Sequence, residues 1–214
     1  MEEEKTSEIK ELGAAESDIL TVSVIGQIEG HYILSETQKT TKYEHILPLL
    51  ATAERDKRVK GLIVMINTVG GDVEAGLAIA EMLAGMKKPT VSLVLGGGHS
   101  IGLPIAVACD RSLCVPSASI TVHPVRISGT VLGVPQAFSS LEKMQARVNA
   151  FIVSHSGISE EKLCELMMNT GELTTDVGSV ISGDEAVRLG LIDAIGGISD
   201  AMAALDAMIK PEEK

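Results

Sequence analysis

The stretch Gly61-Leu-Ile-Val-Met-Ile66 is a continuous apolar run, which is typical of a strand covered on both faces. The glycine pair Gly70-Gly71 follows it, and an alanine-rich segment over about 72–86 then has the character of a helix. Between residues 90 and 100 the succession recurs as a strand, a glycine turn and the start of an apolar helix. Strands that alternate with helices through short connections predict an α/β fold with a mostly parallel sheet flanked by helices.

The rest of the chain extends this pattern in both directions. A β-branched alternation from Ile19 is expected to form a strand that stops at Gly26. Ser182 is expected to cap a helix through the sequence Ser182-Gly-Asp-Glu185, and Ser199 to cap the last helix. The remaining expected elements are helices over 43–54, 135–154 and 159–169 and strands over 111–115 and 119–122.

Composition narrows the class of protein. The chain has 214 residues, 45% of them hydrophobic, which is enough for a folded core. Its net charge of -11 repels phosphate backbones and anionic lipids, and only 2% of its residues are aromatic, so bases have little to stack on. We therefore expect no nucleic-acid partner and no role at a membrane surface.

The start of the chain is acidic. Residues 1–18 hold seven acidic residues and two lysines and are expected to form a flexible arm, with a single domain over residues 19–210. A secretory signal would need positive charge there, so a cytoplasmic location is expected. Pro89 to Cys109 lacks charged residues, but glycines interrupt it, so no membrane span is expected. Three cysteines without metal-site spacing are expected to be reduced and mostly buried, with no metal bound.

The motif Gly98-His99-Ser100-Ile101-Gly102 is a G-x-S-x-G at a strand-to-helix turn, the context in which such a serine is presented as a nucleophile. His123 ends the next strand but one and is a candidate general base. Each residue also has a purely structural interpretation. The serine motif can be a packing turn, and His123 can be a histidine of the core. A carboxylate is needed to orient the imidazole, and three aspartates follow in the chain: Asp176, Asp184 and Asp193.

The order of residues along the chain excludes one hydrolase class. An α/β-hydrolase places an acid and then a histidine after its serine, which here would be Glu142 and His155. These two are expected on one helix, about 20 Å apart, so they cannot form one site. A catalytic triad in the order Ser, His, Asp along the chain is the arrangement that remains.

These segments together resemble the ClpP family of serine peptidases, the Clp proteolytic subunits. The resemblance lies in the sequence Met65-Ile-Asn-Thr-Val-Gly-Gly71, in the serine motif around Ser100 and in Ile120-Thr-Val-His-Pro124, and it covers about residues 19–198. It implies a fold of the ClpP/crotonase type, built from repeated ββα-type units. It also implies a serine endopeptidase that hydrolyses peptides or unfolded proteins without a cofactor.

The resemblance assigns roles to individual residues. It implies Ser100 as nucleophile, His123 as base, and the amides of Gly71 and Ile101 as oxyanion donors. An ungapped comparison puts Gly178 at the position of the family's triad acid, and a shift of two residues reaches Asp176, which we favour. Asp184 is instead expected in a helix cap and Asp193 at a strand end.

The resemblance also implies an assembly. The family forms ring-shaped homo-oligomers, two stacked heptamers in its usual arrangement, through a long helix for which residues 136–154 are the candidate. The family's axial-loop segment has no match here, so docking of an AAA+ unfoldase is unsupported. Thr68-Val69 stands where the family usually has Ser-Pro, and His99 stands where a small residue is usual. These departures keep open a second hypothesis, a catalytically weak scaffold or regulatory protein.

Two other possibilities are weaker. The crotonase superfamily shares the fold type, but its chemistry does not need the pair Ser100 and His123, and no nucleotide-binding signature is evident. A serine-lysine peptidase would need a suitably placed lysine.

Overall fold

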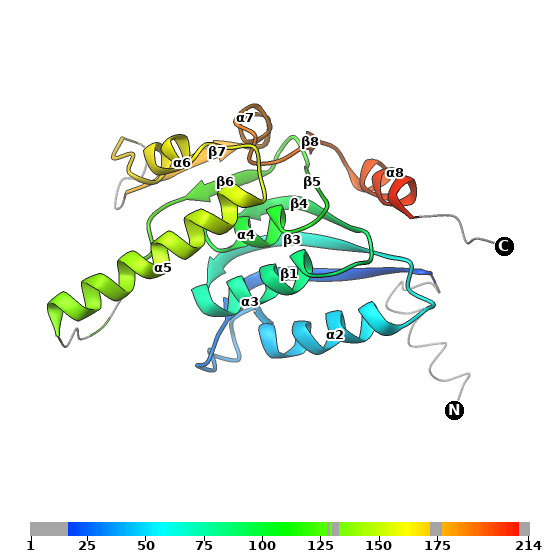
Figure 1. Ribbon diagram of the computed structural model, residues 1–214, viewed down its shortest axis with the longest axis horizontal. Helices are drawn as coiled ribbons and strands as arrows, with labels where there is room; N and C mark the ends of the chain where they lie inside the picture. Colours follow the sequence, from blue (N-terminus) through cyan, green and yellow to red (C-terminus); the bar gives the residue numbers. More distant parts are fainter. Residues whose placement is uncertain (1–16, 128, 130–132, 172–176, 210–214) are drawn as a thin grey trace.

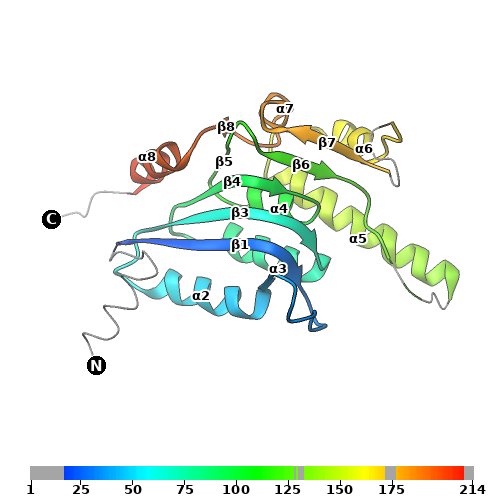
Figure 2. The same ribbon diagram turned by 180° about the vertical axis from the view of Figure 1, so that it is seen from behind.

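The sheet at the centre of the molecule has the expected, mostly parallel character. The computed structural model describes residues 17–127, 129, 133–171 and 177–209. Six of the described strands lie in the order β2-β1-β3-β4-β5-β8, and every neighbouring pair is parallel (Figures 1 and 2). The bounds of these strands are β1 Ile19–Glu29, β2 Thr40–Lys42, β3 Gly61–Gly71, β4 Thr90–Gly98, β5 Arg111–Cys114 and β8 Ala194–Ile195.

Two further strands form a ribbon beside β4. β6 (Ser119–Val122) touches β4 at the single pair Gly97 and Ser119, and it pairs antiparallel with β7 (Ser179–Ser182) along its whole length. The candidate nucleophile follows β4 and the candidate base follows β6, so this ribbon sets their relative position.

Helices cover both faces of the sheet, and the strand β3 shows why. Leu62, Val64 and Ile66 point into the larger core, beneath the helices that follow β2, β3 and β4. Ile63 points to the opposite face and packs with Leu205 of the last helix. A strand with both faces buried needs apolar residues at consecutive positions, as the sequence predicts. The helices are α2 Tyr43–Arg55, α3 Val73–Ala84, α4 Gly102–Val107, α5 Val134–Ser154, α6 Glu160–Met167, α7 Gly183–Arg188 and α8 Ile198–Met208.

Helix α5 extends away from the sheet, as both views show (Figures 1 and 2). Its C-terminal half is anchored, because Val148 and Ile152 are buried in the main core. Its N-terminal half exposes Val134 and Phe138, with 69% and 63% of their surfaces accessible. An apolar stripe thus continues beyond the part of the helix that the core uses.

The strands continue through glycines at which the sequence predicts that they stop. β1 continues past Gly26 with a shift of register, and Gly70 and Gly71 still pair with β1. β4 likewise runs on to Gly98. The expectation that β1 stops at Gly26 is therefore wrong, because backbone pairing to a neighbouring strand continues the ladder at residues of low strand propensity.

The two expected helix caps have different outcomes. Ser182 caps α7, since its hydroxyl accepts a hydrogen bond from the Glu185 amide at 3.3 Å. Ser199 does not cap α8, because the helix begins earlier, after Gly197. The carboxylate of Asp200 accepts a hydrogen bond from the Gly197 amide at 2.8 Å. This contact stands where the sequence predicts a cap by Ser199.

The cysteines match the expectation of reduced thiols. Cys109 and Cys114 are buried and Cys164 is half-buried, all without disulfides. Burial raises the pKa of Cys109 to about 12 and that of Cys114 to about 11, so neither thiol ionises near neutral pH.

Among the helices of the described ranges, none is both long enough and apolar enough to cross a membrane. The predicted acidic arm, residues 1–18, lies outside the described residues except for residues 17 and 18.

Candidate active site

Ser100 occupies a strained turn between β4 and α4. Its φ angle is 55°, and no other described residue apart from glycines has a positive φ. Non-glycine residues in this region are uncommon and are often found at functional sites. The Ser100 amide donates a hydrogen bond to the Thr121 carbonyl at 2.8 Å. The turn is therefore tied to β6, two residues before His123.

A glycine lies directly against the serine. A Cβ atom built on Gly70 would lie 2.7 Å from the Ser100 Cβ and 3.2 Å from its Oγ, and the φ angle of Gly70 is 88°. Only glycine satisfies both the close approach and this backbone angle. The end of β3 consequently places the Gly70-Gly71 backbone beside the candidate nucleophile, as the sequence predicts.

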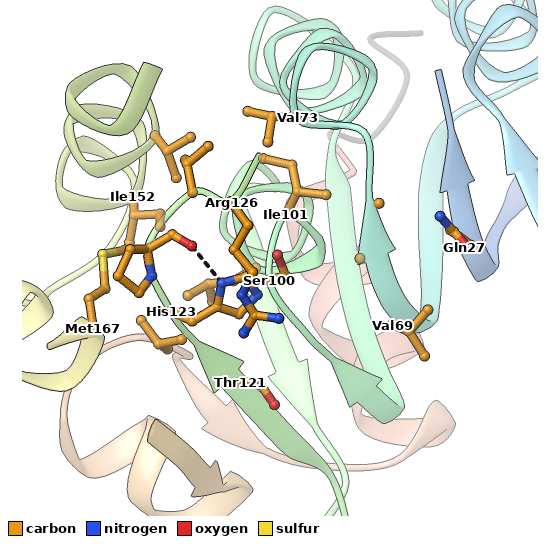
Figure 3. A pocket seen from close by; sticks show the side chains of 17 residues that line it. Gln27, Val69, Val73, Ser100, Ile101, Thr121, His123, Arg126, Ile152 and Met167 are labelled. Carbon is orange, nitrogen blue, oxygen red and sulfur yellow. Dashed lines mark hydrogen bonds between the residues drawn. The ribbon is translucent and has the colours of Figure 1, made fainter. Parts of the chain in front are cut away.

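His123 lies just after β6, and a backbone carbonyl orients its ring. The Nδ1 atom is 2.7 Å from the Pro124 oxygen, the contact drawn as a dashed line in Figure 3. A carbonyl oxygen only accepts, so Nδ1 carries the proton in this contact. In the neutral ring Nε2 is then the basic nitrogen, as a general base requires.

Ser100 and His123 open into one cleft of about 350 Å³ (Figure 3). Its walls are part polar and part apolar, and they come from β1, β3, α3, α4, β6, α5 and α6 and from the turns beside them. Gly71 and Ile101, the two candidate oxyanion donors, lie in the same lining. The other lining residues are Gln27, Val69, Gly70, Val73, Leu103, Thr121, Val122, Pro124, Val125, Arg126, Val148, Ile152 and Met167. Four of the five predicted site residues therefore meet in one cleft.

The fifth predicted site residue, Asp176, lies outside the described residues. Gly178, two positions later, touches the base: a Cβ atom built on it would lie 2.7 Å from the His123 Cβ and 2.5 Å from the Val122 oxygen. No side chain fits at position 178 without a shift, so this position itself offers His123 no carboxylate.

The two other aspartates have different surroundings. The carboxylate of Asp193 accepts hydrogen bonds from the amide and hydroxyl of Ser112, at 2.8 and 3.0 Å, and so joins β5 to the start of β8. Asp184 is exposed in the first turn of α7. Asp184 thus lies in the first turn that Ser182 caps, and Asp193 lies next to a strand, directly before β8.

Thr68 and His99, which depart from the family pattern, both make side-chain hydrogen bonds. The Thr68 hydroxyl donates to the Gly26 carbonyl at 2.6 Å and accepts from the Gly70 amide at 3.1 Å, so it stabilises the irregular pairing of β1 with β3. The His99 Nδ1 lies 2.8 Å from the Thr121 hydroxyl. Burial lowers the pKa of His99, which favours its neutral form.

Sequence reasoning missed two residues of the site, Thr121 and Arg126, and the contact that Gly178 makes with His123. Thr121 holds the Ser100 amide, Gly178 packs on His123, and Arg126 brings a positive charge to the cleft. Arg126 had a detectable signal, since it is a basic residue three positions after the candidate base in a chain of net charge -11. Thr121 and Gly178 act through backbone contacts between distant segments, which residue type does not reveal.

Ser100 and His123 thus line one cleft on an α/β fold. A family model described as Clp protease matches residues 18–199. The chain therefore belongs to the Clp protease family.

Individual relatives give a more varied picture. The chain is 57% identical over 198 residues to the translocation-enhancing protein TepA of Halalkalibacterium halodurans, covering 92% of this chain and 77% of that protein. It is 29% identical over 140 residues to proteolytic subunit 1 of the ATP-dependent Clp protease of Chlamydia muridarum, covering 63% of this chain and 69% of that subunit. A solved ClpP1 mutant from Listeria monocytogenes has the same fold, with a TM-score of 0.67 at 22% identity, covering 85% of this chain and 94% of that one.

Proposed function

We propose that the protein is a cytoplasmic serine endopeptidase that cleaves peptides or unfolded proteins. One observation carries this proposal: Ser100 lies in a strained turn whose amide is bonded to the strand leading to His123, and both side chains open into one cleft. A turn that served only for packing would not need a non-glycine residue at positive φ beside a glycine backbone.

The proposed mechanism is acyl transfer. The Ser100 hydroxyl attacks the scissile carbonyl while Nε2 of His123 accepts its proton and then returns it to the leaving amine. The amides of Gly71 and Ile101 donate to the oxyanion. A water molecule, activated in turn by His123, then hydrolyses the acyl-enzyme and restores the Ser100 hydroxyl.

We further propose Asp176 as the third member of the triad. Two residues of chain span at most about 7 Å, and Gly178 is in contact with His123. The Asn169 carbonyl accepts a hydrogen bond from the Gly178 amide at 2.7 Å, so both ends of the segment that contains Asp176 meet near the base. A carboxylate from this segment would stabilise the imidazolium that forms during catalysis.

The exposed stripe of α5 supports assembly into a ring of identical chains. Large apolar side chains such as Phe138 on a projecting helix are typical of a contact surface between subunits. We propose a homo-oligomeric ring, with two stacked heptamers as the expected form. Docking of an unfoldase is not part of this proposal.

The second candidate function is a scaffold with little peptidase activity. It is favoured by the 57% identical relative, whose name describes translocation enhancement, and by the absence of a side chain at Gly178. Turnover of peptides by the wild type and by Ser100→Ala separates the two candidates, because equal rates would favour the scaffold.

The direct test of the peptidase proposal is labelling with a fluorophosphonate probe. We expect a single adduct, located on Ser100 by peptide mass spectrometry, on the assembled wild-type protein. The adduct should be lost in His123→Ala, because the serine is then no longer activated. No adduct on a folded, assembled sample would overturn the peptidase proposal.

A further inference from the structure

The peptide group between Pro124 and Val125 is held from both sides. On one side the Pro124 oxygen accepts the hydrogen bond from Nδ1 of His123 at 2.7 Å (Figure 3). On the other side the Val125 amide donates to Oε1 of Gln145 at 2.7 Å. A carbonyl and the amide that follows it lie in one rigid plane, so a rotation of this plane breaks both contacts. Gln145 therefore fixes the acceptor that orients the candidate base.

The proline leaves this peptide group one main rotation. Its ring fixes the φ angle at about −65°, so the direction of the Pro124 carbonyl depends on ψ. The contact between Val125 and Gln145 sets that direction. Gln145 lies on α5 one turn before Val148, which is buried in the main core, so the contact is made from an anchored part of the helix.

Gln145 is itself oriented by groups between α5 and α6. Its Nε2 atom donates to Oδ1 of Asn149 at 2.7 Å and to the sulfur of Met167 at 3.3 Å. Asn149 is buried, with 7% of its surface accessible, and donates to Sγ of Cys164 at 3.6 Å. Because these acceptors engage the nitrogen of Gln145, its oxygen faces the Val125 amide. A group that positions a catalytic residue needs this kind of support.

The hydrogen bonds of this network run in one direction. His123 donates to the peptide, the peptide donates to Gln145, and Gln145 donates to Asn149. Aligned hydrogen bonds polarise one another, so a peptide whose N–H is engaged has a more negative carbonyl oxygen. The benefit increases when the imidazole becomes positively charged during catalysis, since hydrogen bonds from charged donors are stronger.

We propose that Gln145 is a positioning residue for His123, which holds the protonated Nδ1 through the Pro124–Val125 peptide and so keeps Nε2 as the basic nitrogen. This inference rests on the proposed peptidase function. It adds a residue outside the cleft, since Gln145 is not among the lining residues that the structure describes. Its contribution is additional to that of the proposed acid, Asp176.

Two substitutions separate the contact with Val125 from the rest of the network. Gln145→Met and Gln145→Glu both keep the length of the side chain and both lose the donor to Asn149. Only the glutamate keeps an oxygen that accepts from the Val125 amide. A purely structural role of the network would therefore be damaged in both variants, whereas the positioning role would be damaged only in Gln145→Met.

The rate of fluorophosphonate labelling of Ser100 and the kinetics of peptide hydrolysis measure this difference. Gln145→Met should lower the labelling rate and kcat by about 5- to 100-fold, the effect of leaving a part-buried donor without its partner. KM should change little, because the substrate does not reach Gln145. Gln145→Glu should retain most of the wild-type rate. Circular dichroism and native mass spectrometry check that both variants are folded and assembled.

A second measurement reports the proton on the ring without any turnover. Solid-state nitrogen-15 NMR of histidine-labelled protein at about pH 9, where the ring is neutral, distinguishes a protonated Nδ1 from a protonated Nε2. The His123 signals are those lost in His123→Ala. Every sample carries Asp176→Ala, so that the proposed acid cannot hold the same proton. We expect protonated Nδ1 with Gln145 or Gln145→Glu, and a mixture of both forms with Gln145→Met.

The outcomes for the two proposals are distinct. Equal labelling rates in the wild type and both variants, or an equal loss in both, would overturn the role of Gln145 and leave the peptidase standing. A protonated Nδ1 that persists in Gln145→Met would also overturn that role. A shift of the proton in Gln145→Met alone, without labelling of Ser100 in the wild type, would support Gln145 as the residue that holds the ring and overturn the peptidase.

Discussion

At the scale of the residue, the Pro124 carbonyl orients the His123 ring but does not replace a carboxylate. It fixes the tautomer, but a neutral carbonyl stabilises a charged imidazolium less than a carboxylate does. The proposed mechanism therefore needs an acid near the ring for fast turnover. This need makes the assignment of Asp176 testable.

Asp176→Ala should lower kcat by a factor on the order of 10⁴, the effect of disabling the acid in serine triads. Peptide hydrolysis measured at saturating substrate checks this. Asp184→Ala is the matched control and should leave kcat near the wild-type value, since Asp184 is exposed on α7. Near-normal turnover in Asp176→Ala would move the role to another group.

Gly178→Ala should destabilise the protein more than Gly129→Ala. Both glycines have positive φ, 140° and 120°, but a Cβ at Gly178 would meet the Val122 oxygen at 2.5 Å, whereas nothing lies within 4 Å of one at Gly129. Backbone strain alone costs about 1–3 kcal/mol, and only Gly178→Ala adds the clash and displaces His123. Urea unfolding of both variants measures the difference, and equal losses would mean that the close contact does not matter.

The individual site residues were predicted to different degrees. Ser100, His123, Gly71 and Ile101 follow from motifs and strand ends, and the structure brings them to one cleft. Arg126 belongs to no motif, and it lines the cleft because of the path that the chain takes after β6. Asp176 stays a prediction, since it lies outside the described residues and the choice between the two alignments rests on a shift of two positions.

At the scale of the element, an ion pair joins two helices at the edge of the cleft. Arg147 of α5 contacts Glu74 of α3 at 2.6 Å, and their neighbours Val148 and Val73 line the cleft. The Arg147 hydrogen bond holds the pKa of Glu74 below its ordinary 4.5. The pair thus ties the two walls together while Glu74 is ionised.

The stability that this pair contributes should depend on pH. Because the folded pKa is the lower one, the contribution is complete above pH 4.5 and is lost as pH falls through the folded pKa. Both side chains are about half exposed, so we expect only about 0.2–1 kcal/mol at pH 7. Urea unfolding of wild type and Glu74→Gln should show this difference at pH 7, less in 1 M salt. A difference that grows on acidification would contradict the assignment.

Most helices and strands could be predicted from the sequence. The parts that could not be predicted depend on pairing with neighbouring strands. Apolar runs such as the one in β3 identify strands directly, because both faces are buried. β7 has four residues of which only Ser179 and Ile181 are buried, so no run reveals it. The glycine ends of β3 and β4 are held by neighbouring strands rather than by their own propensity, which a single segment cannot show.

At the scale of the whole molecule, the projecting half of α5 predicts the assembly state. Native mass spectrometry should show complexes of 7 or 14 copies of the 22.5 kDa chain. Phe138→Glu should shift these toward smaller species, because a charge then faces the subunit contact, while the circular dichroism spectrum stays unchanged. A wild-type protein that remains monomeric at micromolar concentration would contradict the ring.

The strained backbone at Ser100 determines which inactive variant is the better tool. An alanine at a φ of 55° retains the unfavourable left-handed conformation, whereas a glycine adopts it freely, with a difference of about 1–2 kcal/mol that its greater unfolded-state entropy partly offsets. Ser100→Gly should therefore melt at a higher temperature than Ser100→Ala, and calorimetry of the two measures this. The nucleophile would then be a site where natural selection has accepted lower stability for reactivity, and the glycine variant would be the more robust trap for isolating bound substrates from cells.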